Sequence, residues 1–184
     1  MSRRRGRRWA SAAAIALVLA VTACAGLGDG GADHEDAEKA LLGQRDAVEE
    51  TAQGLVAASQ DVLGGEVLES RGRWEGCTSR FPEGYQDFRY IADVRLQARP
   101  GTPEDVGADL RTIAERSGYA VRGSSAGDRV RVDDGAVAAD LMDIPDLGAE
   151  GDVLIRLAAG PCVAVPQDDW PDWMSRDDPG PDVG

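Results

Sequence analysis

The sequence predicts an α+β fold, in which an antiparallel sheet of about five to six strands carries two helices on one of its faces. Two segments repeat their apolar residues with the period of a helix, and several short segments alternate apolar and polar residues. Short turns join most of the alternating segments, and such turns connect antiparallel neighbours. The chain has 184 residues, of which 42% are hydrophobic, and this is enough for one domain with its own core.

The first predicted helix runs from about residue 34 to residue 63 and ends at Gly64-Gly65. Four apolar residues recur every seven positions and form one stripe: Leu41, Val48, Leu55 and Val62. The stripe either covers a sheet or forms a coiled-coil seam for a partner helix. Because a helix of this length is longer than a small domain needs, we expect its first part to project, or Gly43 and Gly54 to bend it.

The apolar period changes to two from residue 67 onward, which predicts a strand over 67–74 and a second one over 88–96. The second is the most regular strand of the chain, with one buried and one polar face, and only Ile91 breaks the alternation. A helix follows, with Thr102 as its N-cap, Pro103 in its first turn and Gly118 at its end.

Four short strands are predicted after this helix, over residues 119–122, 129–132, 136–141 and 153–157. Asp134-Gly135 is typical of a two-residue hairpin turn between two of them. Residues 162–165 either extend the last strand or form another.

The N-terminus predicts an export signal. Arginines precede an uncharged apolar stretch, Ala10 to Val21, which is too short for a comfortable membrane span. The stretch closes with Val21-Thr22-Ala23-Cys24, which resembles the lipobox of bacterial lipoproteins. The resemblance implies that Cys24 is lipidated and that the protein lies on the outer face of the cell membrane. A plain anchor helix is the alternative, and the paired arginines fit a twin-arginine signal poorly.

Four regions follow from these patterns: a signal peptide over 1–23, the lipidated Cys and a flexible tether over 24–33, a single α+β domain over 34–166, and a tail over 167–184. The tail is acidic and rich in proline, so we expect it to be disordered. Trp170 and Trp173 are its large apolar residues. They are candidate contact residues, as a docking motif or a sugar-stacking pair, unless they fold back onto the domain or are simply exposed.

Removal of residues 1–23 takes away five arginines and no acidic residue, and lowers the formal charge from −13 to −18. This balance argues against nucleic acid as a partner, because phosphates need positive charge to bind. The acidity either serves solubility or attracts a cationic partner.

Three cysteines are present, and Cys77 and Cys162 are left once Cys24 is assigned to lipid. An even number of cysteines in an oxidising compartment predicts a disulfide between them. Zinc lacks ligands, because no Cys-x-x-Cys occurs and the only histidine, His34, lies beside the tether.

The sequence contains little that indicates catalysis. Residues 123–127 match the Gly-x-Ser-x-Gly pattern of a nucleophile elbow, but a strand rather than a helix follows, so we expect a turn. Asp133-Asp134-Gly135 could chelate calcium, although a tight turn explains it more simply. Lys39 is the only lysine and there is no asparagine, which excludes several hydrolase sites. We therefore predict no enzyme and no cofactor.

Arginine used in place of lysine, with abundant Ala, Gly, Asp and Val, is typical of GC-rich coding. Together with the lipobox, Trp74-Glu75-Gly76-Cys77 and the late Cys162 to Val165, the chain is similar to small lipoproteins of actinomycetes. This resemblance implies no active-site residues. We expect a membrane-anchored binding or interaction domain whose partner is an envelope protein or a small ligand. The alternatives are an envelope hydrolase that uses carboxylates and a spacer that pairs through its first helix.

Overall fold

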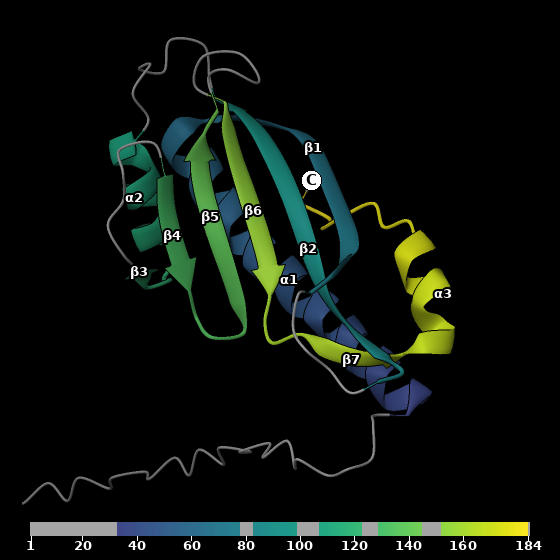
Figure 1. Cartoon of the computed structure of the whole chain (residues 1–184). Helices are drawn as coiled ribbons and strands as arrows, with labels where there is room; N and C mark the ends of the chain where they lie inside the picture. Colours follow the sequence, from purple (N-terminus) through teal and green to yellow (C-terminus); the bar gives the residue numbers. More distant parts are fainter. Residues whose placement is uncertain (1–32, 78–82, 99–106, 123–128, 145–151, 184) are drawn as a thin grey trace, which may run out of the picture.

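A computed structural model describes residues 33–77, 83–98, 107–122, 129–144 and 152–183. It is an α+β fold with a seven-stranded antiparallel sheet and three helices in this part of the chain (Figure 1). The expected fold class is confirmed, but the sheet is larger by at least one strand and a third helix is present.

Helix α1 (His34–Leu63) begins at Asp33, whose carboxylate accepts a hydrogen bond from the Asp36 N–H at 3.0 Å. Its end at Gly64 has φ 62°, a left-handed conformation that favours glycine. The apolar stripe is buried from Ala37 onward and packs on the sheet, so the first part of the helix does not project. The stripe therefore covers the sheet and leaves no coiled-coil seam. None of the helices in the described part of the chain is both long and apolar enough to cross a membrane.

The strands are β1 Gly65–Gly76, β2 Tyr85–Ala98, β3 Val121–Arg122, β4 Arg129–Asp133, β5 Val137–Asp143, β6 Val153–Ala159 and β7 Val163–Pro166. Their order in the sheet is β1-β2-β6-β5-β4-β3, and β7 pairs with the start of β2. The segment after β6 thus forms a strand of its own, because Gly160 and Pro161 separate the two.

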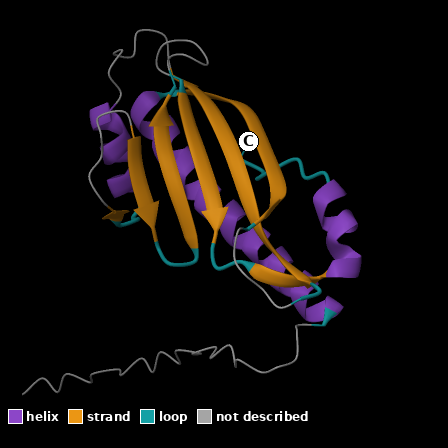
Figure 2. Cartoon of the chain, in the orientation of Figure 1, coloured by secondary structure: helices purple, strands orange, loops and turns teal. Residues whose placement is uncertain are grey.

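Helix α1 and helix α2 (Gly107–Arg116) cover the same face of the sheet, as expected (Figure 2). The core lies between this face and the helices, and Leu55, Val94, Leu110 and Ile155 are fully buried in it. The other face has no helix over it in the described residues (Figure 2).

Cys77 and Cys162 form the expected disulfide, with their Cα atoms 6.5 Å apart. Cys77 follows β1 and Cys162 precedes β7, and both of these strands pair with β2. The bond therefore joins the end of the first strand to the start of the last.

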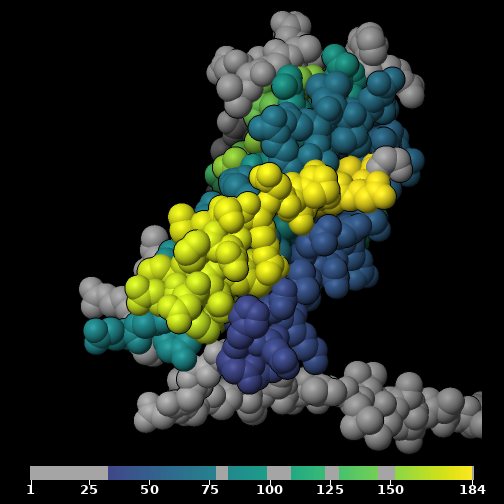
Figure 3. All heavy atoms as spheres, turned by 90° about the vertical axis from the view of Figure 1, so that its right-hand side faces the viewer, coloured from purple at the N-terminus to yellow at the C-terminus, as the bar shows by residue number. Residues whose placement is uncertain are grey.

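The segment after residue 166 differs from the disordered tail that the sequence predicts. It forms a 3-10 turn, Gln167–Asp169, and a short helix, α3 (Trp170–Ser175), and then runs between α1 and β1 (Figure 3). Trp173 is only 2% exposed, with its ring centroid 4.8 Å from that of Trp74 on β1. The segment is ordered because it lies beside the edge strand β1 and buries apolar surface there, which its acidic, proline-rich composition does not indicate.

Asp178 fastens this segment, which we call the C-terminal strap (residues 167–183). Its carboxylate accepts hydrogen bonds from the Tyr90 hydroxyl at 2.7 Å and the Gly180 N–H at 2.8 Å, and pairs with Arg45 of α1 at 2.9 Å. The Asp178 carbonyl accepts a bond from the Gly72 N–H, so the strap also covers part of the free edge of β1.

Several predicted features lie outside the described residues. These are the signal peptide, Cys24 and nearly all of the tether, the N-cap Thr102 with Pro103 beside it, and the 123–127 segment.

Candidate binding surface

The single histidine forms an ion pair with the C-terminal strap. His34 is at the start of α1, 59% exposed, and its Nδ1 lies 2.7 Å from the carboxylate of Asp169. The hydrogen bond and the negative charge of Asp169 raise the pKa of the His34 imidazole. Its partner is thus a strap carboxylate, and the pair links the beginning of α1 to the beginning of the strap.

The Asp133-Asp134-Gly135 motif is a turn. The Asp133 carboxylate accepts from the Gly135 N–H, and that of Asp134 accepts from the N–H groups of Ala136 and Val137, each at 2.8 Å. Gly135 has φ 93°, which favours glycine. These backbone bonds account for both carboxylates. No group of three or more metal-ligating side chains occurs in the described part of the chain.

The two tryptophans of the strap both contact the domain. Trp173 packs between Trp74 and the guanidinium of Arg176, which lies 3.8 Å from its ring centroid. Trp170 is half-buried and donates its indole N–H to the carbonyl of Val165. The structure therefore places them as packing residues, and Trp173 has almost no surface left for a ligand.

Most arginines of the described residues lie on the sheet face that no described helix covers. The alternation of each strand and the cross-strand register bring eight of them to this face: Arg71, Arg73, Arg89, Arg95, Arg122, Arg129, Arg131 and Arg156. We call it the arginine face. It stands out because the protein as a whole is strongly acidic.

One row of charged residues crosses the arginine face from edge to edge. Each residue is the register partner of the next, in the order Arg71, Asp93, Arg156, Asp140, Arg131 and Arg122. Side chains at paired positions on one face are neighbours, so six strands contribute to one continuous charged row.

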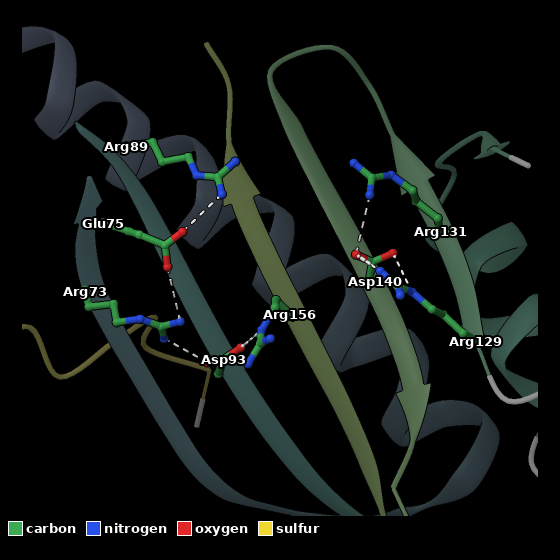
Figure 4. Close-up of polar contacts among 8 residues, drawn as sticks. All are labelled: Arg73, Glu75, Arg89, Asp93, Arg129, Arg131, Asp140 and Arg156. Atoms are coloured by element: carbon green, nitrogen blue, oxygen red, sulfur yellow. Dashed lines mark hydrogen bonds and ion pairs between the residues drawn. The ribbon is translucent and has the colours of Figure 1, made fainter. Parts of the chain in front are cut away.

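Two clusters within this face each hold one carboxylate between two guanidinium groups (Figure 4). In the first, Asp93 binds Arg156 at 2.7 Å and Arg73 at 2.8 Å. In the second, Asp140 binds Arg129 at 2.6 Å, and Arg131 lies 3.6 Å away. Glu75 joins Arg89 and Arg73 beside the first cluster. Guanidinium groups therefore outnumber carboxylates among the residues drawn in Figure 4.

The carboxylates form the inner layer of these clusters and the guanidinium groups form the outer layer. The Asp93 and Asp140 side chains are 22% and 14% exposed, whereas those of Arg129, Arg131 and Arg156 are 50–53% exposed. Burial disfavours the charged form of Asp93, but hydrogen bonds and attraction from Arg156 and Arg73 outweigh it and lower the pKa of this carboxyl group. Asp93 therefore stays ionised at neutral pH and keeps the two arginines oriented.

Arg122 and Arg131 are direct cross-strand partners with the same charge. Like charges at paired positions destabilise a sheet, and Arg122 has no ion-pair partner among the described residues. Nothing among the described residues offsets this repulsion at Arg122, and a position that breaks a local rule in this way is where a functional constraint is expected.

Among the described residues, the arginine face carries an open hollow of about 220 Å³, lined by residues that include Asp93, Arg95 and Leu154. Pockets for small molecules are usually about 300–1,000 Å³ and enclose their ligand. A glycosidase built on carboxylates also needs a protonated acid, and the lowered pKa of Asp93 has the opposite effect. The face suits contact with a partner's surface better than catalysis.

The charged row of the arginine face is predictable in part from the sequence. Arg89, Asp93 and Arg95 stand at the polar positions of the most regular predicted strand, and Arg129 and Arg131 repeat this pattern. Which of these side chains meet across strands depends on strand order, and order is set by the packing of the whole sheet. The roles of Asp178 and Tyr90 had no signal in the sequence.

Comparison with known proteins finds no match among protein family models, curated proteins or solved structures.

Proposed function

We propose that the protein is a lipid-anchored, non-enzymatic binding domain on the outer face of the cell membrane, and that the arginine face is its recognition surface. The observation that carries the proposal is the gathering of eight arginines on the one sheet face that no described helix covers. Exposed arginines are enriched at protein interfaces, because their planar groups bind carboxylates through paired hydrogen bonds.

Two other candidate contact surfaces are less suitable. The apolar stripe of α1 is buried in the core of the domain. It therefore does not support the alternative in which the protein is a spacer that pairs through its first helix. Trp173 is buried against Trp74. The arginine face is therefore the surface with the strongest chemical character in the described residues.

The anchor part of the proposal rests on the N-terminal sequence. Cys24 would carry the lipid, and two acyl chains hold a protein stably at a membrane whereas one chain holds it marginally. The stretch from Cys24 to the start of α1 at His34 spans at most about 36 Å when extended. The domain would therefore stay close to the membrane, and its partner would be found in that layer.

Mass spectrometry of the protein isolated from its own membrane tests the anchor. We expect a chain that begins at Cys24 and carries a diacylglyceryl group, and we expect the Cys24→Ala variant to leave the membrane fraction. An intact Met1 or an unmodified Cys24 in the wild-type protein would contradict the anchor.

Site-specific photo-crosslinking in cells tests the recognition surface. A photoreactive residue replaces Leu154, which lines the hollow of the arginine face, and the matched control replaces Leu42, which is 39% exposed on α1. We expect a discrete cross-linked product from position 154 that is absent from position 42. Equal products from both positions, or none from position 154, would show that this face is not the recognition surface.

A further inference from the structure

We infer that the hollow of the arginine face is the binding site for one uncharged aromatic side chain that a partner protein presents. This inference deepens the proposed function and rests on it. The hollow, of about 220 Å³, is smaller than pockets for small molecules, which usually measure about 300–1,000 Å³. Since an apolar cavity of about 150 Å³ holds one benzene molecule, the hollow has room for one aromatic ring.

The charged groups that line the hollow favour an uncharged occupant. Three arginines line it, and each has a carboxylate partner among the described residues: Arg71 with Glu69, Arg95 with Asp152, and Arg156 with Asp93. Glu69 and Asp93 line the hollow as well, so a carboxylate from a partner would meet two groups of its own charge. An uncharged side chain avoids this repulsion.

The ion pairs leave the faces of the guanidinium groups open to a ring. All N–H donors of a guanidinium group lie in its plane, so a carboxylate binds at an edge of the group and not over a face. Nε and Nη2 of Arg156 donate to the two carboxylate oxygens of Asp93 at 2.7 and 3.3 Å, and the Arg156 side chain is still 50% exposed. The face of an aromatic ring attracts such a cation. An aromatic side chain can therefore bind here without breaking an ion pair.

Apolar side chains complete the lining of the hollow. Leu154 is the register partner of Arg95 and lies two residues before Arg156 on the same side of β6, and Ile144 follows the end of β5. Both apolar side chains are half-buried. A ring that packs on them is removed from water, which is favourable.

The C-terminal strap already contains a contact of this kind. Arg176 pairs with Glu38 at 3.2 Å, and its guanidinium group lies over the ring of Trp173, 3.8 Å from the ring centroid. An arginine of this protein thus binds a carboxylate and an indole at the same time. An aliphatic side chain in the hollow would gain the apolar contact but not the attraction between ring and cation, so the hollow should prefer an aromatic one.

Methyl NMR spectroscopy of the protein isolated from its membrane, in phosphatidylcholine nanodiscs, tests the inference. The probe is the uncharged peptide Ser-Gly-Ser-Trp-Ser-Gly-Ser with blocked ends, and two control peptides carry Leu or Glu in place of Trp. We expect the probe to shift the methyl signals of Leu154 and Ile144, because an aromatic ring shifts the signals of protons close to it. The signals of Leu42, which is 39% exposed on α1, should not move. The probe should bind at least about fivefold more tightly than either control.

Variants locate the binding, with Ile144 as the reporter. Leu154→Phe places a larger side chain in the lining of the hollow and should weaken probe binding at least about fivefold, whereas the same change at Leu42 should have no effect. Arg156→Lys keeps the charge but loses the planar group, and it should also weaken probe binding about fivefold. Arg116→Lys, at an exposed position of α2, is its matched control and should bind as the wild type does. Thermal unfolding and circular dichroism confirm that each variant is folded.

The inference is overturned if the probe does not bind, if the Leu peptide binds as well as the probe, or if the Glu peptide binds more tightly. Wild-type affinity in the Leu154→Phe or Arg156→Lys variant overturns it too. If cross-links form at position 154 while the peptides give one of these results, the partner chemistry is wrong and the proposed recognition surface stands. If the cross-links are absent as well, both fail.

Discussion

Asp93 and Asp178 show how single carboxylates organise distant parts of this chain. Asp93 lies at the surface and orients two arginines, and the partial exposure of these side chains limits what each ion pair contributes to stability. Asp178 is only 9% exposed and accepts from a tyrosine hydroxyl and a backbone N–H as well as pairing with Arg45. Burial and three partners make Asp178 the more important residue for the fold.

Tyr90→Phe tests the importance of this network for stability. Burial and the hydrogen bond to Asp178 raise the pKa of the Tyr90 hydroxyl, so it is a donor at all physiological pH values. We expect the variant to lose about 2 kcal/mol of unfolding free energy in urea titrations, because a bond to a charged acceptor is lost. Tyr119→Phe, whose hydroxyl has no hydrogen bond among the described residues, is the control and should change stability by less than about 0.5 kcal/mol. Equal losses would contradict the assigned role of Asp178.

His34→Gln tests the link between α1 and the strap as a function of pH. The pKa of His34 is raised above its usual 6.5, so its pair with Asp169 stabilises the fold fully below that pH and is lost as the pH rises through the higher folded-state pKa. The wild type should therefore melt at a higher temperature than the variant at about pH 5, and the difference should disappear by about pH 9. A difference that grows with pH would contradict the pairing.

At the scale of elements, the C-terminal strap packs against the edge strand β1. It passes between α1 and β1, where Trp173 packs on Trp74 and Asp178 forms a β-bridge with Gly72 of β1. A long exposed edge invites pairing with other chains, and the strap occupies part of that edge. Its composition predicts disorder because charge and proline dominate it, yet its two tryptophans pack on the domain and its polar groups bind α1 and β1.

Gly72→Ala tests how closely the strap fits. A Cβ atom at this position would collide with the Tyr90 hydroxyl and come within 2.7 Å of the Asp178 carboxylate, so we expect the strap to be displaced. Trypsin should then cleave after Arg176 much faster, and stability should fall by about 1–3 kcal/mol. Gly43→Ala is the control: nothing lies within 4 Å of its Cβ position, and the helix should gain about 0.5–1 kcal/mol. Unchanged cleavage in the Gly72 variant would contradict this packing.

At the scale of the whole molecule, helices and strap bury one face of the sheet while the other face carries charge. The disulfide joins the end of the first strand to the last strand, over a separation of 85 residues. In the described residues the fold is a two-layer domain, and no helix covers its arginine face.

Replacement of both cysteines, Cys77→Ser with Cys162→Ser, should lower the unfolding free energy by about 4–5 kcal/mol, because the unfolded chain gains the entropy of a long open loop. Guanidinium unfolding measures this loss, and the Cys24→Ala variant with the disulfide intact is the control. Two reactive thiols in the unfolded, unreduced wild-type protein would contradict the disulfide.

The sequence alone determined those features that depend on local order. The 3.6-residue and two-residue periods predict α1, β1, β2 and the later strands with nearly correct limits, and Asp134-Gly135 predicts its turn, because each depends on neighbours along the chain. The cysteine count predicts the disulfide once Cys24 is set aside. The N-terminal resemblance to a lipobox and the function inferred from it stay predictions.

The tertiary structure decided what depends on contacts between distant segments. Strand order places Arg156 between Asp93 and Asp140, and no local period carries that information. The strap folds because Tyr90, Arg45 and Trp74, all far from it in sequence, provide its partners. Burial of a segment and pairing of a charge are properties of the whole packed molecule, and for this reason the ordered strap and the charged row emerge only in three dimensions.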